Sequence, residues 1–82
     1  TLVQLFSWDE ATFLRCTEGS PIRRIGHVRW LRNIAVAMGN ALTTALSADD
    51  RAAIQTALQQ RASHDSEIVR EHVQWALAQA NQ

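Results

Sequence analysis

Apolar residues recur along the chain at spacings of three and four, which places them on one face of a helix. Three such stripes consist of Leu31, Ile34, Ala35 and Met38, of Ile54, Ala57 and Leu58, and of Val69, Val73, Ala76 and Leu77. Residues that break helices are scarce, with one Pro and three Gly among 82 residues. The pattern therefore predicts an all-α fold of about five helices.

Capping residues set the expected limits of the first helix. Ser7, with Glu10 three residues later, has the spacing of a capping box, so we expect a helix to begin near Trp8. Gly19 is placed to end it, because glycine readily adopts the left-handed conformation that closes many helices. The Ser-Pro pair that follows predicts a short helix over residues 21–25.

Three longer helices are expected after Gly26, which breaks the short one. They cover residues 27–38, residues 48–61, and a last stretch from Asp65 or Ser66 to about residue 80. We expect the first of them to stop at Gly39 and Asn40, since both residue types are frequent just beyond a helix. Ser47, followed three residues later by Asp50, is expected to cap the second.

Two of the predicted helices resemble each other. Residues 30–41 and 69–80 match in apolar and small residues at a spacing of 39 positions, the difference between 69 and 30. A helical repeat of about 40 residues is typical of HEAT-type solenoids. We therefore expect one HEAT-like domain of antiparallel helix pairs over residues 1–82, with residues 1–26 as a helical cap or linker and residues 27–82 as the repeat helices.

Positive charge comes from eight arginines and no lysine, balanced by eight acidic residues. The balance is not uniform, because residues 15–46 hold five arginines against the single acid Glu18. Five residues in this stretch form the candidate site, here called the arginine patch: Arg23, Arg24, Arg29, Arg32 and Asn33. Arginine binds phosphate through a fork of donors and stacks on bases. The patch predicts a polyanionic partner and favours nucleic acid.

Helical phase places part of the patch on one face. Arg29, Arg32 and Asn33 share a side of the helix expected from residue 27, away from its apolar stripe. The arginines would position a nucleic-acid backbone, while Asn33 can bond a base edge or a ribose. The alternative is a solvated surface, in which the arginines pair with nearby acids and Asn33 ties neighbouring helices together.

Composition excludes several other functions. A single cysteine rules out an internal disulfide or a cysteine-built metal cluster, and fits a reducing, cytoplasmic compartment. The three histidines lack the spacing of a helical metal pair, and no catalytic triad or phosphate loop is present. We expect no catalytic residues, no metal and no membrane role. We expect packing roles for His27, His64, His72, Trp8, Trp30, Trp75 and Cys16, with the cysteine buried.

Three segments resemble one family. Residues 17–26 (TEGSPIRRIG) and 29–41 (RWLRNIAVAMGNA) resemble the C-terminal region of bacterial epoxyqueuosine reductases. Residues 69–77 (VREHVQWAL) fit the closing HEAT-like repeat of that family. The resemblance spans nearly the whole chain and is specific over residues 13–41, but it is weak over residues 42–64.

This resemblance implies an enzyme that reduces epoxyqueuosine to queuosine in tRNA with cobalamin and two 4Fe-4S clusters. In the family the cofactors lie in upstream domains, so no cofactor is expected in this chain. The C-terminal domain helps to hold the tRNA anticodon stem-loop, which implies tRNA and the upstream domains as partners. The chain begins at Thr1 rather than Met and lacks the cysteines that would hold the clusters. Together with the resemblance, this leads us to expect a non-catalytic C-terminal fragment of such a reductase.

Two other functions remain open. HEAT-like helices commonly bind proteins, so the chain is alternatively a docking module whose arginines pair with acids of another domain and make no nucleic-acid contact. The third function is DNA binding, because phosphate contacts alone do not distinguish DNA from RNA.

Overall fold

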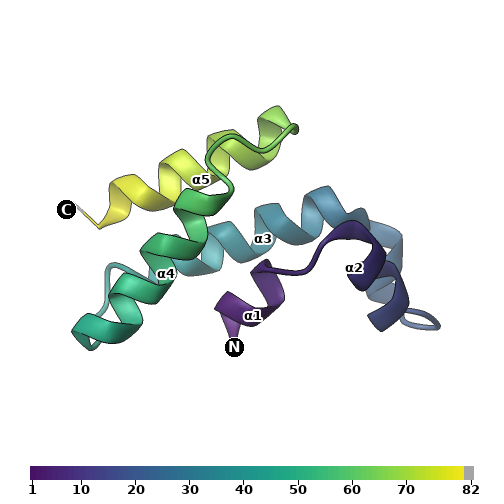
Figure 1. The fold of residues 1–82 in the computed structure, drawn as a ribbon, viewed down its shortest axis with the longest axis horizontal. Coiled ribbons are helices and arrows are strands. Elements are labelled where there is room, and N and C mark those ends of the chain that lie inside the picture. Colours follow the sequence, from purple (N-terminus) through teal and green to yellow (C-terminus); the bar gives the residue numbers. More distant parts are fainter. Residues whose placement is uncertain (81–82) are drawn as a thin grey trace.

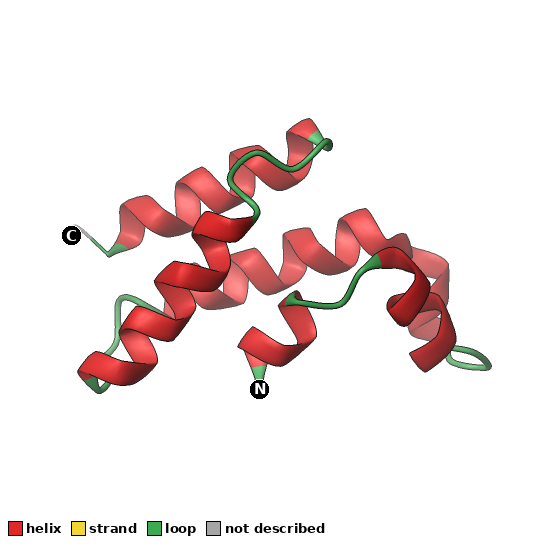
Figure 2. Ribbon diagram, in the orientation of Figure 1, coloured by secondary structure: helices red, strands yellow, loops and turns green. Residues whose placement is uncertain are grey.

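The computed structural model describes residues 1–80, and this part of the chain is helical without any strand (Figure 2). The elements are α1 (Leu2–Phe6), α2 (Glu10–Cys16), the 3-10 helix η1 (Pro21–Ile25), α3 (Gly26–Ala41), α4 (Ala48–Gln60) and α5 (Glu67–Gln79). The predicted all-α fold is confirmed. The expected domain over residues 1–82 extends two positions past the described residues.

Helices α3 and α5 pack side by side and run in the same direction, and α4, which lies to one side of this pair, carries the chain back to the start of α5 (Figure 1). Helix α1 packs against α3 and α4, and α2 packs against the beginning of α3. The parallel placement of α3 and α5 matches the internal similarity of their sequences. This arrangement is compatible with a HEAT-like repeat, which stays a prediction.

The core forms where the predicted apolar stripes meet. Leu31 and Met38 of α3, Leu58 of α4, and Val69 and Val73 of α5 are fully buried. Phe6 of the short α1 joins the same cluster, so the first helix belongs to the core. Burying large apolar side chains stabilises a fold by about 1.5–3 kcal/mol each, and this cluster is the main favourable contribution in so small a chain.

Gly39 does not stop a helix as predicted, because α3 continues through it to Ala41. The residue is buried, and a Cβ atom built on it would lie 2.5 Å from Cζ3 of Trp75 and 3.0 Å from Cα of Ala76. The glycine therefore serves the close approach of α3 and α5. The sequence shows only that glycine tends to end helices. The role of Gly39 is decided by the packing of α3 against α5.

The predicted capping box of Ser7 and Glu10 is also wrong. Asp9 caps α2, because its Oδ1 accepts a hydrogen bond from the Thr12 N–H at 2.8 Å. Ser7 instead lies at the end of α1, an unpredicted helix, and its hydroxyl donates to the carbonyl of Gln4 at 2.6 Å. The hydrogen bonds from Thr12 lower the pKa of Asp9 below its usual value, so the ionised carboxylate faces the positive end of the α2 dipole.

Most other predicted boundaries hold within a few residues. Ser20 Oγ accepts from the Ile22 N–H at 3.2 Å to open η1, and Gly26 closes it with a φ of 81°. Ser47 caps α4 and Ser66 caps α5, each through its hydroxyl. Gly19 does not end α2, which stops at Cys16, but it has a φ of 76° in the turn that follows.

The Gly39 contact predicts the effect of adding one methyl group. Alanine normally stabilises a helix interior by about 1 kcal/mol relative to glycine, but the crowding at Trp75 and Ala76 costs about 1–3 kcal/mol. We expect Gly39→Ala to lower the free energy of unfolding in denaturant titrations. The exposed neighbour offers the control Asn40→Ala, which is expected to change it little. A more stable Gly39→Ala chain would contradict the close approach.

Candidate nucleic-acid interface

The eight arginines fall into two groups, of which the first holds the fold together. Arg51 donates to the carbonyl oxygens of Leu42 and Thr44 at 3.0 and 3.1 Å. Arg70 donates to the carbonyl oxygens of His64 and Asp65 at 2.6 and 2.9 Å. Each of these guanidinium groups satisfies carbonyls in a loop between helices, so its charge serves the protein and not a ligand.

Arg61 makes the longest connection of this kind. Its Nε donates to the carbonyl of Phe6 at 2.9 Å and its Nη2 to that of Trp8 at 3.0 Å. The guanidinium carbon also lies 5.4 Å from the centre of the Phe6 ring. Burial lowers the pKa of Arg61 below its ordinary value, and the side chain stays charged. Arg61 therefore ties the α1–α2 segment to the end of α4.

The arginine patch forms most of the second group. Arg23 and Arg24 are exposed on η1 and line a shallow, open depression with Gly19, Ser20 and Pro21. Pro21 and the Ser20 cap fix the turn that presents these two side chains. Within residues 1–80, neither guanidinium donates to backbone carbonyls as those of Arg51, Arg61 and Arg70 do.

The rest of the patch lies on α3, on the side predicted from helical phase. Arg29 and Asn33 are exposed and Arg32 is half-buried, while Leu31 and Ile34 face the core. Arg32 donates through Nε and Nη2 to Asn33 Oδ1 at 3.2 and 3.1 Å. This pairing uses the amide oxygen of Asn33 and leaves its NH2 group to donate to an acceptor such as a phosphate or a base edge. Among the described residues, the Asn33 side chain bonds to its neighbour Arg32 and makes no tie to another helix, which was its alternative role.

Two of the three tryptophans are structural, as predicted. Trp8 and Trp30 stack with ring centres 5.4 Å apart and planes inclined by 14°, and Phe13 packs on Trp30 at 5.4 Å. The indole Nε1 of Trp30 donates to the carbonyl of Leu5 at 3.2 Å. These rings lock α1 and α2 onto α3, and their faces are occupied by one another.

His27 belongs to the same cluster. Its ring packs against Phe13 at 5.9 Å, and Nε2 donates to the carbonyl oxygen of Trp8 at 2.7 Å. The packing role predicted for His27 is confirmed, although its partners are Phe13 and Trp8 and not the nearby Trp30. Because Nε2 is bound to the backbone and the ring packs on Phe13, His27 serves the fold.

Cys16 is exposed, so its predicted burial is wrong. Thr17 occupies the buried position at the end of α2, and its hydroxyl donates to the carbonyl of Phe13 at 2.6 Å. A threonine can be buried there because this bond satisfies its hydroxyl. The apolar character of Cys16 therefore does not decide which of the two neighbouring side chains, Cys16 or Thr17, is buried.

The predicted packing role describes Trp75 incompletely, because much of its side chain is exposed. Its side chain is 41% exposed and lines an open groove with Val36, Glu71 and His72. One signal was present in the sequence, because Trp75 lies off the apolar stripe of its own helix. A tryptophan outside the stripe of an amphipathic helix faces either a partner or solvent.

The residues present do not fit the iron–sulfur clusters that the resemblance implies for a complete reductase. A 4Fe-4S cluster takes four cysteine thiolates, and this chain has Cys16 alone. Within residues 1–80, no group of three His, Cys, Asp or Glu side chains could hold a metal ion. Among the helices of the same residues, none has the length and apolar character needed to span a membrane.

Comparison with known proteins confirms the resemblance seen in the sequence. The chain is 65% identical over 78 residues to the epoxyqueuosine reductase of Alicycliphilus denitrificans, covering 95% of this chain and 22% of that protein. It is 62% identical over 79 residues to that of Xanthomonas campestris (96% and 20%) and 53% identical over 78 residues to that of Escherichia coli (95% and 18%).

The chain spans about a fifth of the length of these curated relatives and matches their C-terminal portion. No family model matches the chain, and no solved structure matches it.

The division of the arginines predicts that substitutions in the two groups change stability by different amounts. Arg61→Gln removes charge-assisted hydrogen bonds to two carbonyls, so we expect the free energy of unfolding to fall by about 2–3 kcal/mol. Arg24→Gln removes an exposed charge and is expected to change it by less than about 0.5 kcal/mol. Urea unfolding followed by circular dichroism measures both values. Equal losses for the two variants would contradict the division.

His64 predicts a pH dependence of stability. Burial, followed by the charge of Arg61, lowers the pKa of His64 below its ordinary value of 6.5, and Nδ1 accepts the Ser66 N–H at 3.0 Å. The unfolded chain therefore binds the proton more tightly than the folded chain. Stability from this group is present above pH 6.5 and is lost as the pH falls through the folded pKa.

His64→Asn keeps an acceptor for the Ser66 N–H but does not titrate. We expect its unfolding temperature to fall less on acidification from about pH 7.5 to about pH 5 than that of the unsubstituted chain. The two proteins differ only at position 64, so the difference between their pH profiles isolates His64. Identical pH profiles would exclude His64 as the cause.

Proposed function

We propose that this chain is a non-catalytic, tRNA-docking domain from the C-terminal part of an epoxyqueuosine reductase, which reduces epoxyqueuosine to queuosine in tRNA. The arginine patch binds the phosphate backbone of the anticodon stem-loop and positions the RNA for a reaction carried out elsewhere in the enzyme. Cobalamin and the 4Fe-4S clusters belong to upstream domains, and the enzyme works in the cytoplasm, where tRNA is modified.

The single observation that carries this proposal is the division of the arginines. The fold uses Arg51, Arg61 and Arg70 to satisfy backbone carbonyls, whereas Arg23, Arg24 and Arg29 remain exposed. Three exposed arginines within seven residues create a local positive field on a chain of zero net charge. That field, together with the similarity to enzymes named for a tRNA nucleoside, supports RNA as the partner.

The patch suits the positioning of RNA more than the reading of its sequence. Guanidinium groups contact phosphates of any sequence, while the free amide donor of Asn33 can bond a base edge or a 2′-hydroxyl. The proposed domain therefore recognises the shape and charge of the stem-loop. Selection of the particular tRNA would rest on the loop bases and on the rest of the enzyme.

Docking to other protein domains is a second candidate function, and exposed apolar residues favour it. Leu14, Ile22 and Val28 are large apolar side chains that remain exposed on α2, η1 and α3. Such residues commonly become buried in an interface. If docking were the sole role, the arginines would pair with acids of the partner domain, and this chain alone would ignore RNA.

Binding of a tRNA anticodon stem-loop across a salt series tests the proposed function. We expect log K to fall linearly with log salt, since each phosphate contact releases counterions. Arg29→Gln/Arg32→Gln is expected to weaken binding by about tenfold or more at low salt and to reduce the salt slope by roughly 1.5. Fluorescence anisotropy of a labelled RNA measures both quantities.

The matched control is Ala52→Glu/Thr56→Glu, which lowers the net charge by the same two units at exposed positions of α4. Its binding is expected to fall far less, because α4 lies outside the patch. Equal losses in the two double variants would indicate a general charge effect. No binding of the unsubstituted chain at low salt would overturn the proposed function and leave domain docking.

A further inference from the structure

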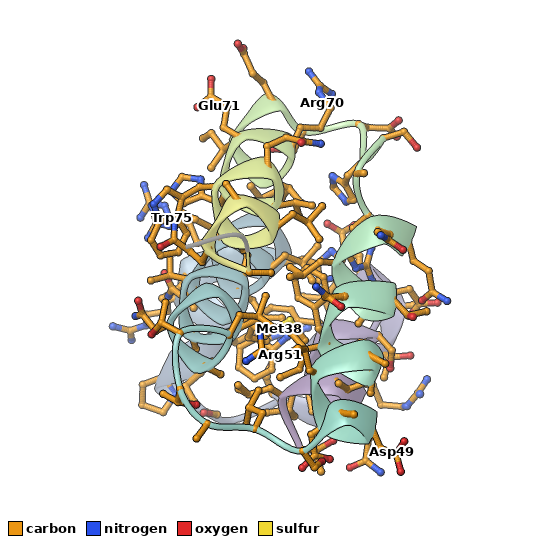
Figure 3. The ribbon with its side chains drawn as sticks, turned by 90° about the vertical axis from the view of Figure 1, so that its left-hand side faces the viewer. Met38, Asp49, Arg51, Arg70, Glu71 and Trp75 are labelled. Atoms are coloured by element: carbon orange, nitrogen blue, oxygen red, sulfur yellow. The ribbon has the colours of Figure 1, made fainter. Side chains whose placement is uncertain are left out.

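Trp75 is a large aromatic side chain that the core does not enclose. It projects from α5 on the side away from α4, together with Glu71 one turn earlier (Figure 3). Each fully buried aromatic residue of this chain lies in α1 or α2, and Trp75 keeps 41% of its surface exposed. Exposing so much apolar surface is unfavourable in water, and it is typical of an aromatic side chain that binds a partner.

Gly39 fixes the position of the Trp75 ring. The Cζ3 atom of the indole lies 2.5 Å from the point where a Cβ of residue 39 would stand, so one part of the ring rests on the backbone of α3. Glycine in a helix interior costs about 1 kcal/mol relative to alanine. Because residue 39 has no side chain, the indole rests on the rigid backbone of α3. The remaining surface of the ring faces the groove.

The groove beside Trp75 combines aromatic, apolar and polar groups. Val36 of α3 and Glu71, His72 and Trp75 of α5 line it. His72 Nδ1 donates to the carbonyl oxygen of Ile68 at 2.7 Å, which leaves Nε2 free to bond a ligand. A flat ligand with hydrogen-bonding groups at its edge is complementary to these walls.

The groove continues from the arginine patch. Arg32 and Asn33 lie four and three residues before Val36, so they occupy the same side of α3 one turn away. An RNA whose phosphates are held at Arg29 and Arg32 would therefore place a neighbouring nucleotide beside Val36 and Trp75. Glu71 makes the groove itself unsuitable for a phosphate, because its carboxylate repels a second anion.

We propose that this groove binds one unpaired nucleobase of the docked RNA. Trp75 is the stacking surface, and the Glu71 carboxylate accepts a hydrogen bond from an exocyclic amino group of the base. This inference rests on the proposed function and extends it from backbone docking to a base-binding site. Stacking on tryptophan tolerates any base, whereas a carboxylate acceptor favours bases that carry an amino group, such as cytosine.

The experiment compares two RNA probes on Trp75 variants of the chain. The first probe is a tRNA anticodon stem-loop, which offers unpaired bases, and the second is a fully paired RNA duplex of equal charge. We expect Trp75→Ala to weaken stem-loop binding by roughly five- to a hundredfold and to leave duplex binding and the salt slope unchanged. Trp75→Phe, which keeps a stacking ring, is expected to retain most of the affinity.

Leu14→Ala is the matched control, since it also shortens an exposed apolar side chain but lies on α2. Thermal unfolding of every variant establishes that each is folded at the binding temperature. Fluorescence of Trp75 provides a second readout, because stacking of a base quenches the indole; Trp8→Phe/Trp30→Phe keeps Trp75 as the sole tryptophan. We expect the stem-loop to quench this protein strongly and the duplex to quench it weakly.

Three results would overturn the base-binding site. Unchanged stem-loop affinity of Trp75→Ala in a chain that still binds RNA through Arg29 and Arg32 would leave the proposed function standing and remove only this inference. Equal losses for stem-loop and duplex would show that Trp75 supports the fold of the patch and does not stack on a base. Absence of RNA binding by the unsubstituted chain would overturn the proposed function and the inference together.

Discussion

The close approach of α3 and α5 is the constraint on which the rest of the structure depends. Gly39 has no side chain, so the backbone of α3 comes within contact distance of Trp75 and Ala76. This contact brings Leu31, Met38, Val69 and Val73 into one core, which α4 and Phe6 then close (Figure 1). Because α3 uses one side for this packing, its other side stays open for Arg29, Arg32 and Asn33.

Arginine has two physical roles in this chain, and the fold separates them. Loop carbonyls near helix ends are left without intrahelical partners, and Arg51, Arg61 and Arg70 supply donors to them. A guanidinium bound to two carbonyls is held against the protein and would have to break these bonds to reach a ligand. The arginines of η1 and α3 carry the same charge, but over residues 1–80 they do not bind backbone carbonyls. This difference in hydrogen bonding, more than the number of charges, identifies the candidate interface. The aromatic cluster of Trp8, Trp30 and Phe13 supports it indirectly by fixing α2 at the beginning of α3.

The sequence predicted correctly most features that depend on residues close together in the chain, namely helix faces and many helix starts. The spacing of apolar residues placed Arg29 and Asn33 on the outer side of α3, and single hydroxyl caps such as Ser47 marked helix starts correctly. The error at Gly39 arose because a distant contact decides, and the approach of α5 to this residue cannot be seen in the sequence. The error at Ser7 is local, because Asp9 is an equally suitable cap and its carboxylate accepts the Thr12 N–H. The carbonyl partners of Arg61 lie more than fifty residues away, so no spacing rule could have separated this arginine from those of the patch.

Side-chain NMR of the arginines during addition of an anticodon stem-loop tests the central claim most directly. The Nε–H resonances of all eight guanidinium groups report on each site separately, without any substitution. The division of roles predicts that Arg29 and Arg32, with Arg23 and Arg24, shift or sharpen as RNA is added, while Arg51, Arg61 and Arg70 keep their positions. Shifts concentrated on the carbonyl-bound arginines, or none on the patch while RNA binds, would contradict it.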